Sequence, residues 1–397
     1  MYNAELFKGF NGFMNRRNFI SVSLMTSAFI IHGKCNGTET VLRPEAFGAV
    51  GDGVAHDGLA IAKLVDFVNE LKGEDEIILR FNGKYNLQGS PSVLMPPTWW
   101  NKNEGVVKGI PPLTRNNVSI MAHNSEFKVP SSFSFRRIKR GGDSRDNFFT
   151  GWQFLGDNCS FYGGVLDGSL DRRKIERGPK PLGFGGNEFG FVMEGKNWYL
   201  ENVTIKNWGT DCIFIASGGL AKNCHFVGGR RNCVSIVAWN RIHENDPVIV
   251  SGGTVTDAAM WPEDSYNNPG AGMVVESSRN NPDSTLIIKG VRFLNNRLKD
   301  LQLSKGAKNC IVEGNTFTNI VTMRPFQRGG HVIKSNVFQG ESNIVLSKAR
   351  KNNPSIMIKD NRHMRESGKF IKRRHGKLPP EGVEQKIMLE NNVYNKG

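Results

Sequence analysis

The sequence predicts an all-β solenoid in which short strands stack as successive coils. Two neighbouring stretches share one pattern, since the run from Phe191 to Asn197 is answered by the run from Ile213 to Asn223. The spacing from Asn197 to Asn223 is 26 residues. A repeat of that length that holds only strand-sized pieces cannot bury its own apolar face, so it must stack on copies of itself.

The apolar pieces of the repeat are expected to be strands. They alternate in polarity, as in Ile213 to Ile215 and Val234 to Ile236, and a period of two places one face inward and one outward. Gly, Asn, Asp and Ser stand between them and suit tight corners, as do the 45 glycines overall. An Asn before Cys or Trp recurs, which predicts a ladder of Asn side chains at one buried corner, unless Asn is here only a common turn residue: Asn158-Cys159, Asn197-Trp198, Asn223-Cys224 and Asn309-Cys310.

Residues 1–36 are expected to be a targeting segment, and residues 37–397 one β-helix domain. Arg16 and Arg17 precede an apolar stretch from Ile20 to Ile31 without an acid. A positive flank before a short apolar core is typical of a secretory signal and is too short to span a bilayer. The Arg-Arg-x-Phe-Ile order resembles a bacterial twin-arginine signal, with Met14 as the expected start. The alternative is an ordinary buried N-terminal helix.

An amphipathic helix is expected to cover the first coil. Asp57 can cap it, and its apolar positions follow helical spacing: Ile61, Leu64, Val65, Val68 and Leu71. With the run Phe47 to Asp57 (FGAVGDGVAHD) before it, this region resembles the N-terminal cap of the pectate-lyase-like superfamily. That superfamily is related to the family 28 glycoside hydrolases and to phage tailspike depolymerases. The resemblance covers about residues 43–397 and implies a single-stranded right-handed parallel β-helix with an N-terminal capping α-helix.

The cysteines and histidines predict neither a disulfide framework nor a metal site. Six Cys are too few for such a framework in 397 residues. Cys159, Cys224 and Cys310 are expected as small core residues. Cys212 and Cys233 begin equivalent strands on neighbouring coils, where stacked packing is favoured over a bridge. No CxxC pair occurs, and no His cluster has metal-ligand spacing.

The outward side of the strands that open each coil is the expected place for chemistry. Alignment of the inward residues gives one outward column of Val192, Phe214, Ser235, Val274 and Gln302, and a second of Glu194, Ala216, Val237, Glu276 and Ser304. Glu276 and Asp300 fall on adjacent coils and are expected about 7–9 Å apart. That separation admits a water between two carboxyls, as an inverting glycosidase requires. The alternative for Glu276 is a solvated surface acid.

The resemblance offers a second position for catalysis. In polygalacturonase-like enzymes an Asn-Thr-Asp corner is followed one coil later by a Gly-Asp-Asp corner. The run Asn207 to Asp211 approximates the first, but Arg230 and Arg231 stand in place of the paired acids of the second. Only a role for Asp211, about three coils from Glu276, therefore carries over. Two arginines near an aspartate also suit β-elimination on a uronic acid, because the arginine fork matches a carboxylate.

The catalytic candidates are thus Asp211, Glu276 and Asp300. The alternative for the first is a structural pair between Arg230 and Asp211. Lyases of this fold commonly bind calcium, so calcium is the expected cofactor only if the chain is a lyase. The expected substrate-binding residues are basic or aromatic neighbours, including two tryptophans of the insertion at 239–269: Arg230, Arg231, Arg279, Lys299, Trp239 and Trp261.

The net charge of +15 and the pI near 9.6 indicate a polyanionic partner. No recognition helix, RNP motif or zinc finger occurs, so nucleic acid is not expected. An exported β-helix meets acidic polysaccharides instead. The expectation is a monomeric, periplasmic or secreted enzyme that cleaves glycosidic bonds of a uronate or sulfated polysaccharide. Hydrolysis and β-elimination both remain open, and the alternative is a β-helix that binds the glycan without cutting it.

Overall fold

The computed structural model of the chain describes residues 40–394 with internal gaps. The gaps are 89, 91, 95–105, 131–134, 137–148, 171–174, 177–187, 242–245, 261–269, 277–284, 305–306, 324–329, 347–355, 365–370 and 374–386. The expected targeting segment at 1–36 lies outside the described residues. Within them, no helix has the length and apolar character needed to cross a membrane.

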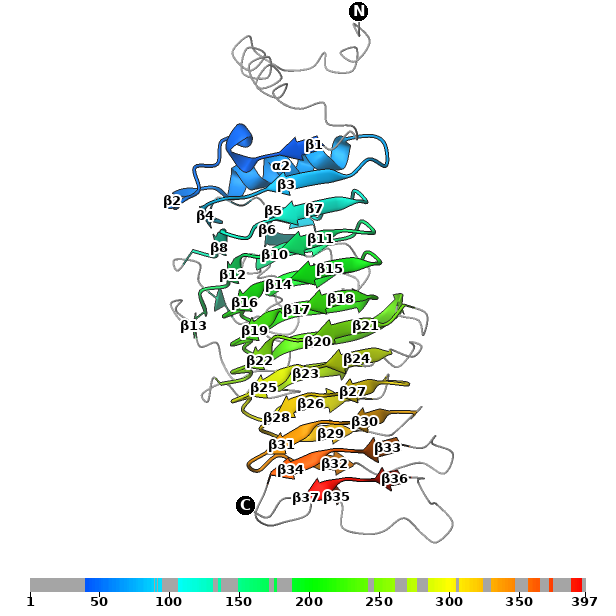
Figure 1. The fold of residues 1–397 in the computed structure, drawn as a ribbon. Helices are drawn as coiled ribbons and strands as arrows, with labels where there is room; N and C mark the ends of the chain where they lie inside the picture. Colours follow the sequence, from blue (N-terminus) through cyan, green and yellow to red (C-terminus); the bar gives the residue numbers. More distant parts are fainter. Residues whose placement is uncertain are drawn as a thin grey trace, which may run out of the picture.

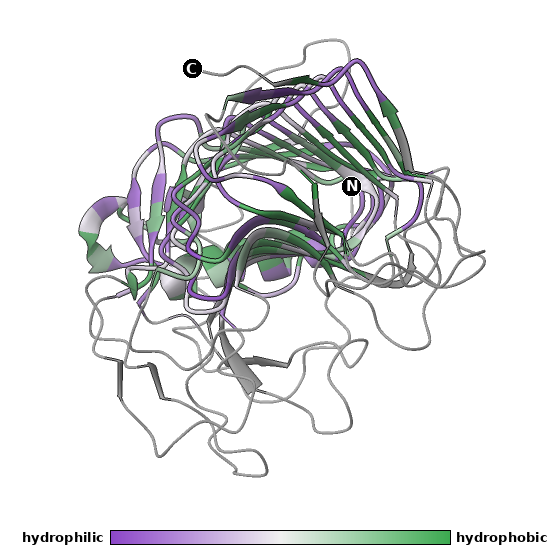
Figure 2. Cartoon of the chain, turned by 90° about the horizontal axis from the view of Figure 1, so that it is seen from below, coloured by the Kyte–Doolittle hydropathy of each residue, from purple (hydrophilic) through white to green (hydrophobic). Residues whose placement is uncertain are grey.

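Three sheets of stacked strands wind around one interior (Figures 1 and 2). Each coil passes through the first sheet, then the second and then the third, before the chain reaches the next coil. Neighbouring strands in the three sheets pair in parallel, except β5 with β6. The predicted fold class, a right-handed parallel β-helix, is confirmed.

The strands of the three sheets are short, as a coil with three corners requires. The first sheet contains β5 (Ser92–Leu94), β6 (Val106–Gly109), β10 (Phe149–Phe154), β14 (Phe189–Met193), β17 (Asp211–Ser217), β20 (Asn232–Arg241), β23 (Ala271–Glu276), β26 (Lys299–Leu303), β29 (Val321–Met323), β32 (Ile344–Leu346) and β35 (Ile371–Arg373). The second contains β1 (Thr40–Leu42), β3 (Ile77–Arg80), β7 (Val118–Met121), β11 (Ser160–Tyr162), β15 (Trp198–Glu201), β18 (Gly219–Lys222), β21 (Val248–Ser251), β24 (Leu286–Lys289), β27 (Ile311–Glu313), β30 (Val332–Lys334), β33 (Ile356–Lys359) and β36 (Ile387–Glu390). The third contains β2 (Asp52–His56), β4 (Lys84–Asn86), β8 (Glu126–Lys128), β12 (Val165–Asp167), β16 (Thr204–Lys206), β19 (His225–Val227), β22 (Thr254–Thr256), β25 (Arg292–Leu294), β28 (Thr316–Phe317), β31 (Val337–Gln339), β34 (Arg362–Met364) and β37 (Val393–Tyr394). A separate pair joins β9 (Phe135–Arg136) to β13 (Ile175–Glu176).

Helix α2 (Gly58–Glu70) covers the N-terminal end of the solenoid, as predicted (Figure 1). Its inward side buries Ile61, Leu64, Val65 and Val68. A short 3-10 helix, η1 (Pro44–Phe47), lies beside it. Burying this apolar stripe closes the core at the end where no further coil can stack.

Asp57 does not cap the helix through its side chain, and that part of the prediction is wrong. The residue has helical φ and ψ of −85° and −13°, whereas a capping residue is usually extended. Its carboxylate instead accepts the backbone N–H of Val50 at 2.7 Å and of Asn86 at 3.3 Å. The acid of the cap motif therefore ties the Gly-rich loop to β4.

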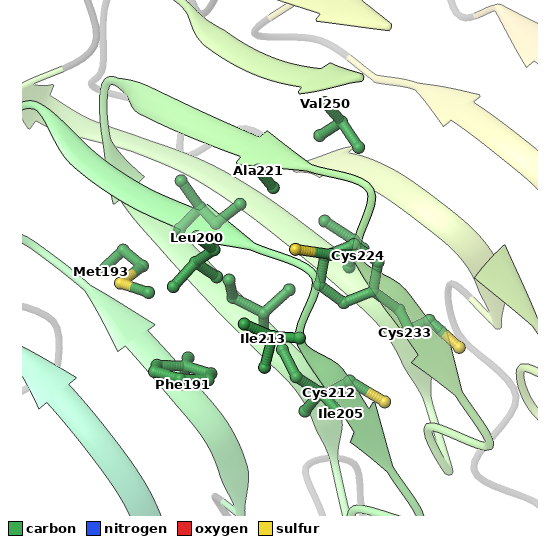
Figure 3. Packing of buried hydrophobic residues seen from close by; sticks show 14 of the residues in the cluster. Phe191, Met193, Leu200, Ile205, Cys212, Ile213, Ala221, Cys224, Cys233 and Val250 are labelled. Atoms are coloured by element: carbon green, nitrogen blue, oxygen red, sulfur yellow. The ribbon is translucent and has the colours of Figure 1, made fainter. Parts of the chain in front are cut away.

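The inward columns of the first sheet follow the alignment made from the sequence. Phe191 pairs in register with Ile213, then come Val234, Met273 and Leu301. All five side chains lie in one hydrophobic core. Figure 3 shows the packing around the first two of them, together with part of the facing sheets.

Asn197 and Asn223 are not equivalent, contrary to the sequence alignment. Trp198 pairs with Gly219, so the coil at this point has 21 residues rather than 26. Asn197 therefore lies at the corner before the second sheet, whereas Asn223 lies at the corner after it. The similar sequences that flank the two asparagines therefore belong to different corners of the coil.

Asparagine ladders nevertheless connect the coils. Asn197 Nδ2 donates to Asn158 Oδ1 at 3.2 Å, and Asn158 Nδ2 donates to Asn117 Oδ1 at 3.0 Å. This ladder is exposed, not buried as predicted. A second ladder, largely buried and not identified from the sequence, has Nδ2 to Oδ1 distances of 2.9–3.0 Å and consists of Asn315, Asn336, Asn361 and Asn392.

The five cysteines that the structure describes are buried. Cys159, Cys224 and Cys310 are buried core residues, as predicted. Cys212 and Cys233 are register neighbours on adjacent coils and remain free thiols. Stacked packing, the favoured expectation for this pair, matches the structure.

Candidate functional site

The outward side of the first sheet carries polar residues at the corner where the third sheet leads into it. Asp211 opens β17 and is register-paired with Asn232, which opens β20. Cys212 and Ile213 both lie in the main core, whereas Phe214 belongs to a second apolar cluster. The chain therefore bends between these residues, and the bend turns Asp211 away from the core.

Arg231 is the main partner of Asp211. Its Nε donates to Oδ1 at 3.0 Å and its Nη2 donates to Oδ2, so two parallel bonds join the guanidinium to the carboxylate. The backbone N–H of Asn232 adds a bond of 3.1 Å to Oδ1. Asp211 has no exposed surface, and Arg231 is 9% exposed. The expected structural partner was Arg230, so that alternative is corrected: the neighbouring arginine makes the pair.

Ser235 extends this network outward along β20. Arg231 Nη2 lies 3.3 Å from Ser235 Oγ, and Asn232 Nδ2 donates to the same oxygen at 3.0 Å. Asn232 Oδ1 accepts the backbone N–H of Ala271 at 3.0 Å and so joins the next coil. Ser235 pairs in register with Val274, which confirms the outward column that the sequence predicts.

Glu188 and Arg230 add a second acid and a second guanidinium to this corner. The carbonyl oxygen of Glu188 accepts the N–H groups of Thr210 and Asp211, both at 3.2 Å, so Glu188 lies on the preceding coil. Arg230 donates its backbone N–H to the carbonyl of Trp208 at 3.0 Å. Both side chains are buried. The corner site is defined here as Glu188, Asp211, Arg230, Arg231, Asn232 and Ser235.

Glu188 was missed by reasoning from the sequence. It directly precedes β14, and Phe189 pairs in register with Asp211, so its place one residue before that column was available as a signal. The insertion between Leu170 and Gly186 hid it, because an acid at the end of an irregular segment has no partner in the repeat. Glu194, which the sequence places in the second outward column, accepts a bond of 3.1 Å from Gln153 Nε2 and is also buried.

Asp300 points to a different environment from Asp211. Its carboxylate accepts Asn296 Nδ2 at 2.9 Å and the backbone N–H groups of Thr318 and Asn319, both at 2.7 Å. It is fully buried. Burial raises the pKa of Asp300, and these hydrogen bonds oppose the rise. The carboxylate thus ties its own corner to the turn of the following coil.

Glu276 and Asp300 are not brought together as expected. Val275 pairs with Leu303 and Ala271 with Lys299, so Asp300 stands level with Gly272, four residues from Glu276. At about 3.3 Å per residue this is an offset of about 13 Å along the strand. The inward columns, which the structure confirms, already imply this offset, so the expected separation of about 7–9 Å was too small for the alignment on which it was based. Asp211 is two coils from β23, not three.

The remaining sequence-predicted residues fall mostly outside the described part of the chain. Arg279 and Trp261 lie outside it altogether, and the side chains of Glu276 and Trp239 do as well. Lys299 is described: its Nζ donates to Gln302 Oε1 at 2.7 Å. The column Asn232, Ala271 and Lys299 places that lysine two coils from the corner site, or about 10 Å.

The outward columns of the first sheet are covered. Val192, Phe214, Ser235, Val274 and Gln302 all point away from the core, yet each is buried. Among the described residues there is no group of three or more His, Cys, Asp or Glu side chains that could hold a metal ion. The arrangement offers one guanidinium, Arg231, paired with the carboxylate of Asp211, and a guanidinium fork of this kind can bind a ligand carboxylate as well as form a salt bridge.

Comparison with known proteins places the chain by fold. No protein-family model matches it, and no curated protein matches it. Among solved structures it is similar to the surface adhesin PfbA of Streptococcus pneumoniae, with a TM-score of 0.56, 12% identity, and coverage of 89% of this chain and 90% of that one. A second structure of the same adhesin gives a TM-score of 0.51, 14% identity, and coverage of 89% and 97%.

The A-module of the mannuronan C-5 epimerase AlgE6 from Azotobacter vinelandii is similar to the same extent. Its TM-score is 0.50 at 15% identity, with coverage of 89% of this chain and 98% of that module. An adhesin and an enzyme therefore match over the same long span. At these identities the comparisons establish a right-handed parallel β-helix, and the reaction has to be argued from the site.

Proposed function

We propose that this protein acts on an acidic polysaccharide and cleaves its glycosidic bonds, with the corner site as the place where uronate or sulfate groups are bound. The observation that carries the proposal is the buried polar network of Asp211, Arg231, Asn232 and Ser235 on the outward side of the first sheet. The fold does not require it, because Phe189 occupies the position of Asp211 on the preceding coil.

Energetics support a functional reading of that network. Two charges removed from water lose about as much in solvation as they gain from each other, so apolar residues of similar volume are often as stable or more so. The neighbours Phe189, Phe214 and Val192 show that apolar side chains fit on this surface. A network that adds little stability is therefore retained for binding or chemistry.

Its chemistry suits an acidic sugar. The planar guanidinium matches a carboxylate or sulfate with two hydrogen bonds, and two guanidinium groups, Arg230 and Arg231, stand at the corner. The net charge of +15 favours approach of a polyanion. The similar AlgE6 module is named for mannuronan, a polymer of uronic acid, which makes alginate the first polymer to test.

Two reactions fit such a substrate. In β-elimination, the carboxylate of a uronate is neutralised, a base removes the proton at C5, the C4–O bond breaks, a C4=C5 double bond forms, and the departing oxygen takes up a proton from the protonated base or from water. Arg230 or Arg231 would neutralise the carboxylate, with an arginine or Lys299 as the base and calcium as a further aid. Hydrolysis would need two carboxyls instead. Both oxygens of Asp211 already accept bonds, which favours elimination.

The first experiment is a panel digest with the full chain. Pectate, alginate, chondroitin, a heparin-like glycan and carrageenan are each incubated with and without calcium, and both reducing ends and the absorbance of unsaturated uronate are followed. Reducing ends with absorbance indicate a lyase, and reducing ends alone indicate a hydrolase. Arg231→Lys should lower the rate, because Lys lacks the fork. Glu313→Gln, in a partly exposed ion pair with Lys334, serves as the control.

The second candidate is a protein that binds an acidic glycan without cutting it. The similarity to PfbA, described as a surface adhesin, favours it. So does the engagement of the carboxylates of Asp211 and Asp300 by groups of the protein itself. Retention on an immobilised acidic glycan without any product would select this candidate. No retention and no product on any polymer would refute both.

Export and a monomeric state complete the proposal. The proposed route is the twin-arginine signal within residues 1–36, which leads to the periplasm or the medium. Expression with Arg16 and Arg17 replaced by Lys should retain the protein in the cytoplasm. Light scattering of the purified chain should give the mass of one chain, 44.2 kDa before processing.

A further inference from the structure

Ser169 adopts a conformation that is unfavourable for its residue type. Its φ is +54°, in the left-handed region, where a Cβ approaches the following carbonyl oxygen. On the next coils the left-handed residue of this corner is Asn207, Gly228 or Asp257, which the strand register places level with Gly168. At the corner after β12 the left-handed conformation therefore falls one residue later, on Ser169, a residue type that adopts it less readily than Asn, Gly or Asp.

The hydroxyl of Ser169 adds a second unfavourable feature. The residue has no exposed surface, and its Oγ has no hydrogen-bond partner among the residues that the structure describes. A buried hydroxyl without a partner opposes folding, and most such groups in folded proteins are satisfied. Strain and a missing partner at one residue are a combination that collects at binding sites, where the ligand supplies the partner.

Specific contacts hold Ser169 in this place. Its N–H donates to Asp167 Oδ1 at 2.8 Å. Asp167 is itself buried, with Lys206 Nζ at 3.5 Å from Oδ2 and Asn207 Nδ2 at 3.4 Å from Oδ1. The turn that ends β12 (Leu166, Asp167 and Gly168) therefore holds Ser169 in place, because the carboxylate of Asp167 fixes the backbone of Ser169.

Ser169 stands beside the corner site. The next residue, Leu170, donates its N–H to the carbonyl of Asn207 at 3.1 Å. At the other end of the same turn, Glu188 donates its N–H to Thr210 Oγ1 at 3.1 Å. That turn leads directly into Asp211. The hydroxyl and the corner site therefore share one turn of four residues, on adjacent coils.

We infer that Ser169 is a substrate-binding residue, whose hydroxyl donates a hydrogen bond to an oxygen of the acidic glycan bound at the corner site. The inference rests on the proposed function and adds a contact that neither the charge nor the arginines supply. A ligand must displace the atoms that now cover the hydroxyl, so binding is compared at equilibrium and not by initial rates.

The test uses Ser169→Gly, Ser169→Ala and a matched control, Ser335→Gly, in the full chain. Ser335 has φ of +56° at a corner far along the solenoid, and it is exposed. Both glycine variants relieve the same backbone strain, but only Ser169→Gly removes a buried hydroxyl. Thermal unfolding and equilibrium binding to immobilised alginate and pectate are measured for all four proteins.

Ser169→Gly should raise Tm by more than Ser335→Gly does, and it should weaken binding about tenfold, the loss of one hydrogen bond of about 1.4 kcal/mol. Ser169→Ala should weaken binding equally, because it lacks the hydroxyl. Ser335→Gly should leave binding unchanged.

Two results separate the failure of this inference from that of the proposed function. If the wild type binds and both Ser169 variants bind as tightly as the wild type does, the role of Ser169 is overturned and glycan binding is not. Wild type that binds neither polymer would overturn glycan binding itself, and the role of Ser169 with it. A Tm for Ser169→Gly at or below that of wild type would also overturn the inference, because the hydroxyl would then have a partner in the folded chain.

Discussion

Replacing Arg231 by Met should leave the carboxylate of Asp211 buried without its main partner. The two guanidinium bonds are lost, and only the backbone N–H of Asn232 remains on the carboxylate. Removing one member of a buried pair costs about 3–5 kcal/mol. Adding Asp211→Asn removes the stranded charge and keeps an acceptor for that N–H. The double variant should therefore regain about 2–3 kcal/mol of the loss.

The assay is a double-mutant cycle in which circular dichroism measures the free energy of unfolding in urea. A parallel cycle on the partly exposed pair of Lys334 and Glu313, at 2.8 Å, should give a coupling of only about 0–1 kcal/mol. Effects at the buried pair that add within about 0.5 kcal/mol would refute the pairing of Arg231 with Asp211. A folded double variant with full activity on the substrate would show that the Arg231–Asp211 pair of the corner site is not needed for the function.

Three further predictions concern pH, the Asn ladder and the cap. Burial lowers the pKa of His331 from 6.5 to about 4. The unfolded chain therefore binds this proton at a higher pH than the folded chain does, and about 3 kcal/mol of stability that is present above pH 6.5 should be lost as the pH falls to 4. His331→Gln should flatten that part of the curve of unfolding free energy against pH. Asn336→Leu breaks bonds to both neighbouring coils and should cost about 2–4 kcal/mol in urea unfolding. Asn197→Gly in the exposed ladder keeps a residue that tolerates the positive φ of 55° and should cost under about 1 kcal/mol; equal losses would contradict the difference in burial. Asp57→Ala frees the N–H groups of the cap loop and should cost about 2 kcal/mol by the same assay, whereas an unchanged midpoint would show that the loop holds without it.

The mismatch of the asparagines in the sequence alignment has a physical origin. Strand periodicity locates the inward face of a strand, and the columns from Phe191 to Leu301 were predicted correctly on that basis. Corners have no such period, since their lengths differ from coil to coil. Asn197 and Asn223 were therefore matched across different corners.

The same limit applies to the acids. Asp211 and Asp300 each lie at the start of a strand in the sequence and look alike there. A bend between Cys212 and Ile213 turns Asp211 outward to Arg231, whereas Asp300 is enclosed by the backbone of the next turn. Backbone amides that meet a carboxylate from another coil leave no mark in a linear pattern. Ser169 likewise left no sign in the sequence, because the turn that it adjoins belongs to the following coil.

The sequence by itself determined the solenoid, its capping helix, the inward columns, the buried cysteines and the excess of positive charge. These follow from local alternation, helical spacing and composition, each of which acts over a few residues. Only the tertiary structure decided which arginine pairs with Asp211, which Asn residues form ladders, and that Ser169 keeps a strained backbone and a buried hydroxyl. Those outcomes depend on the register between coils, because each partner lies about twenty or more residues away along the chain and about 4.8 Å away in space.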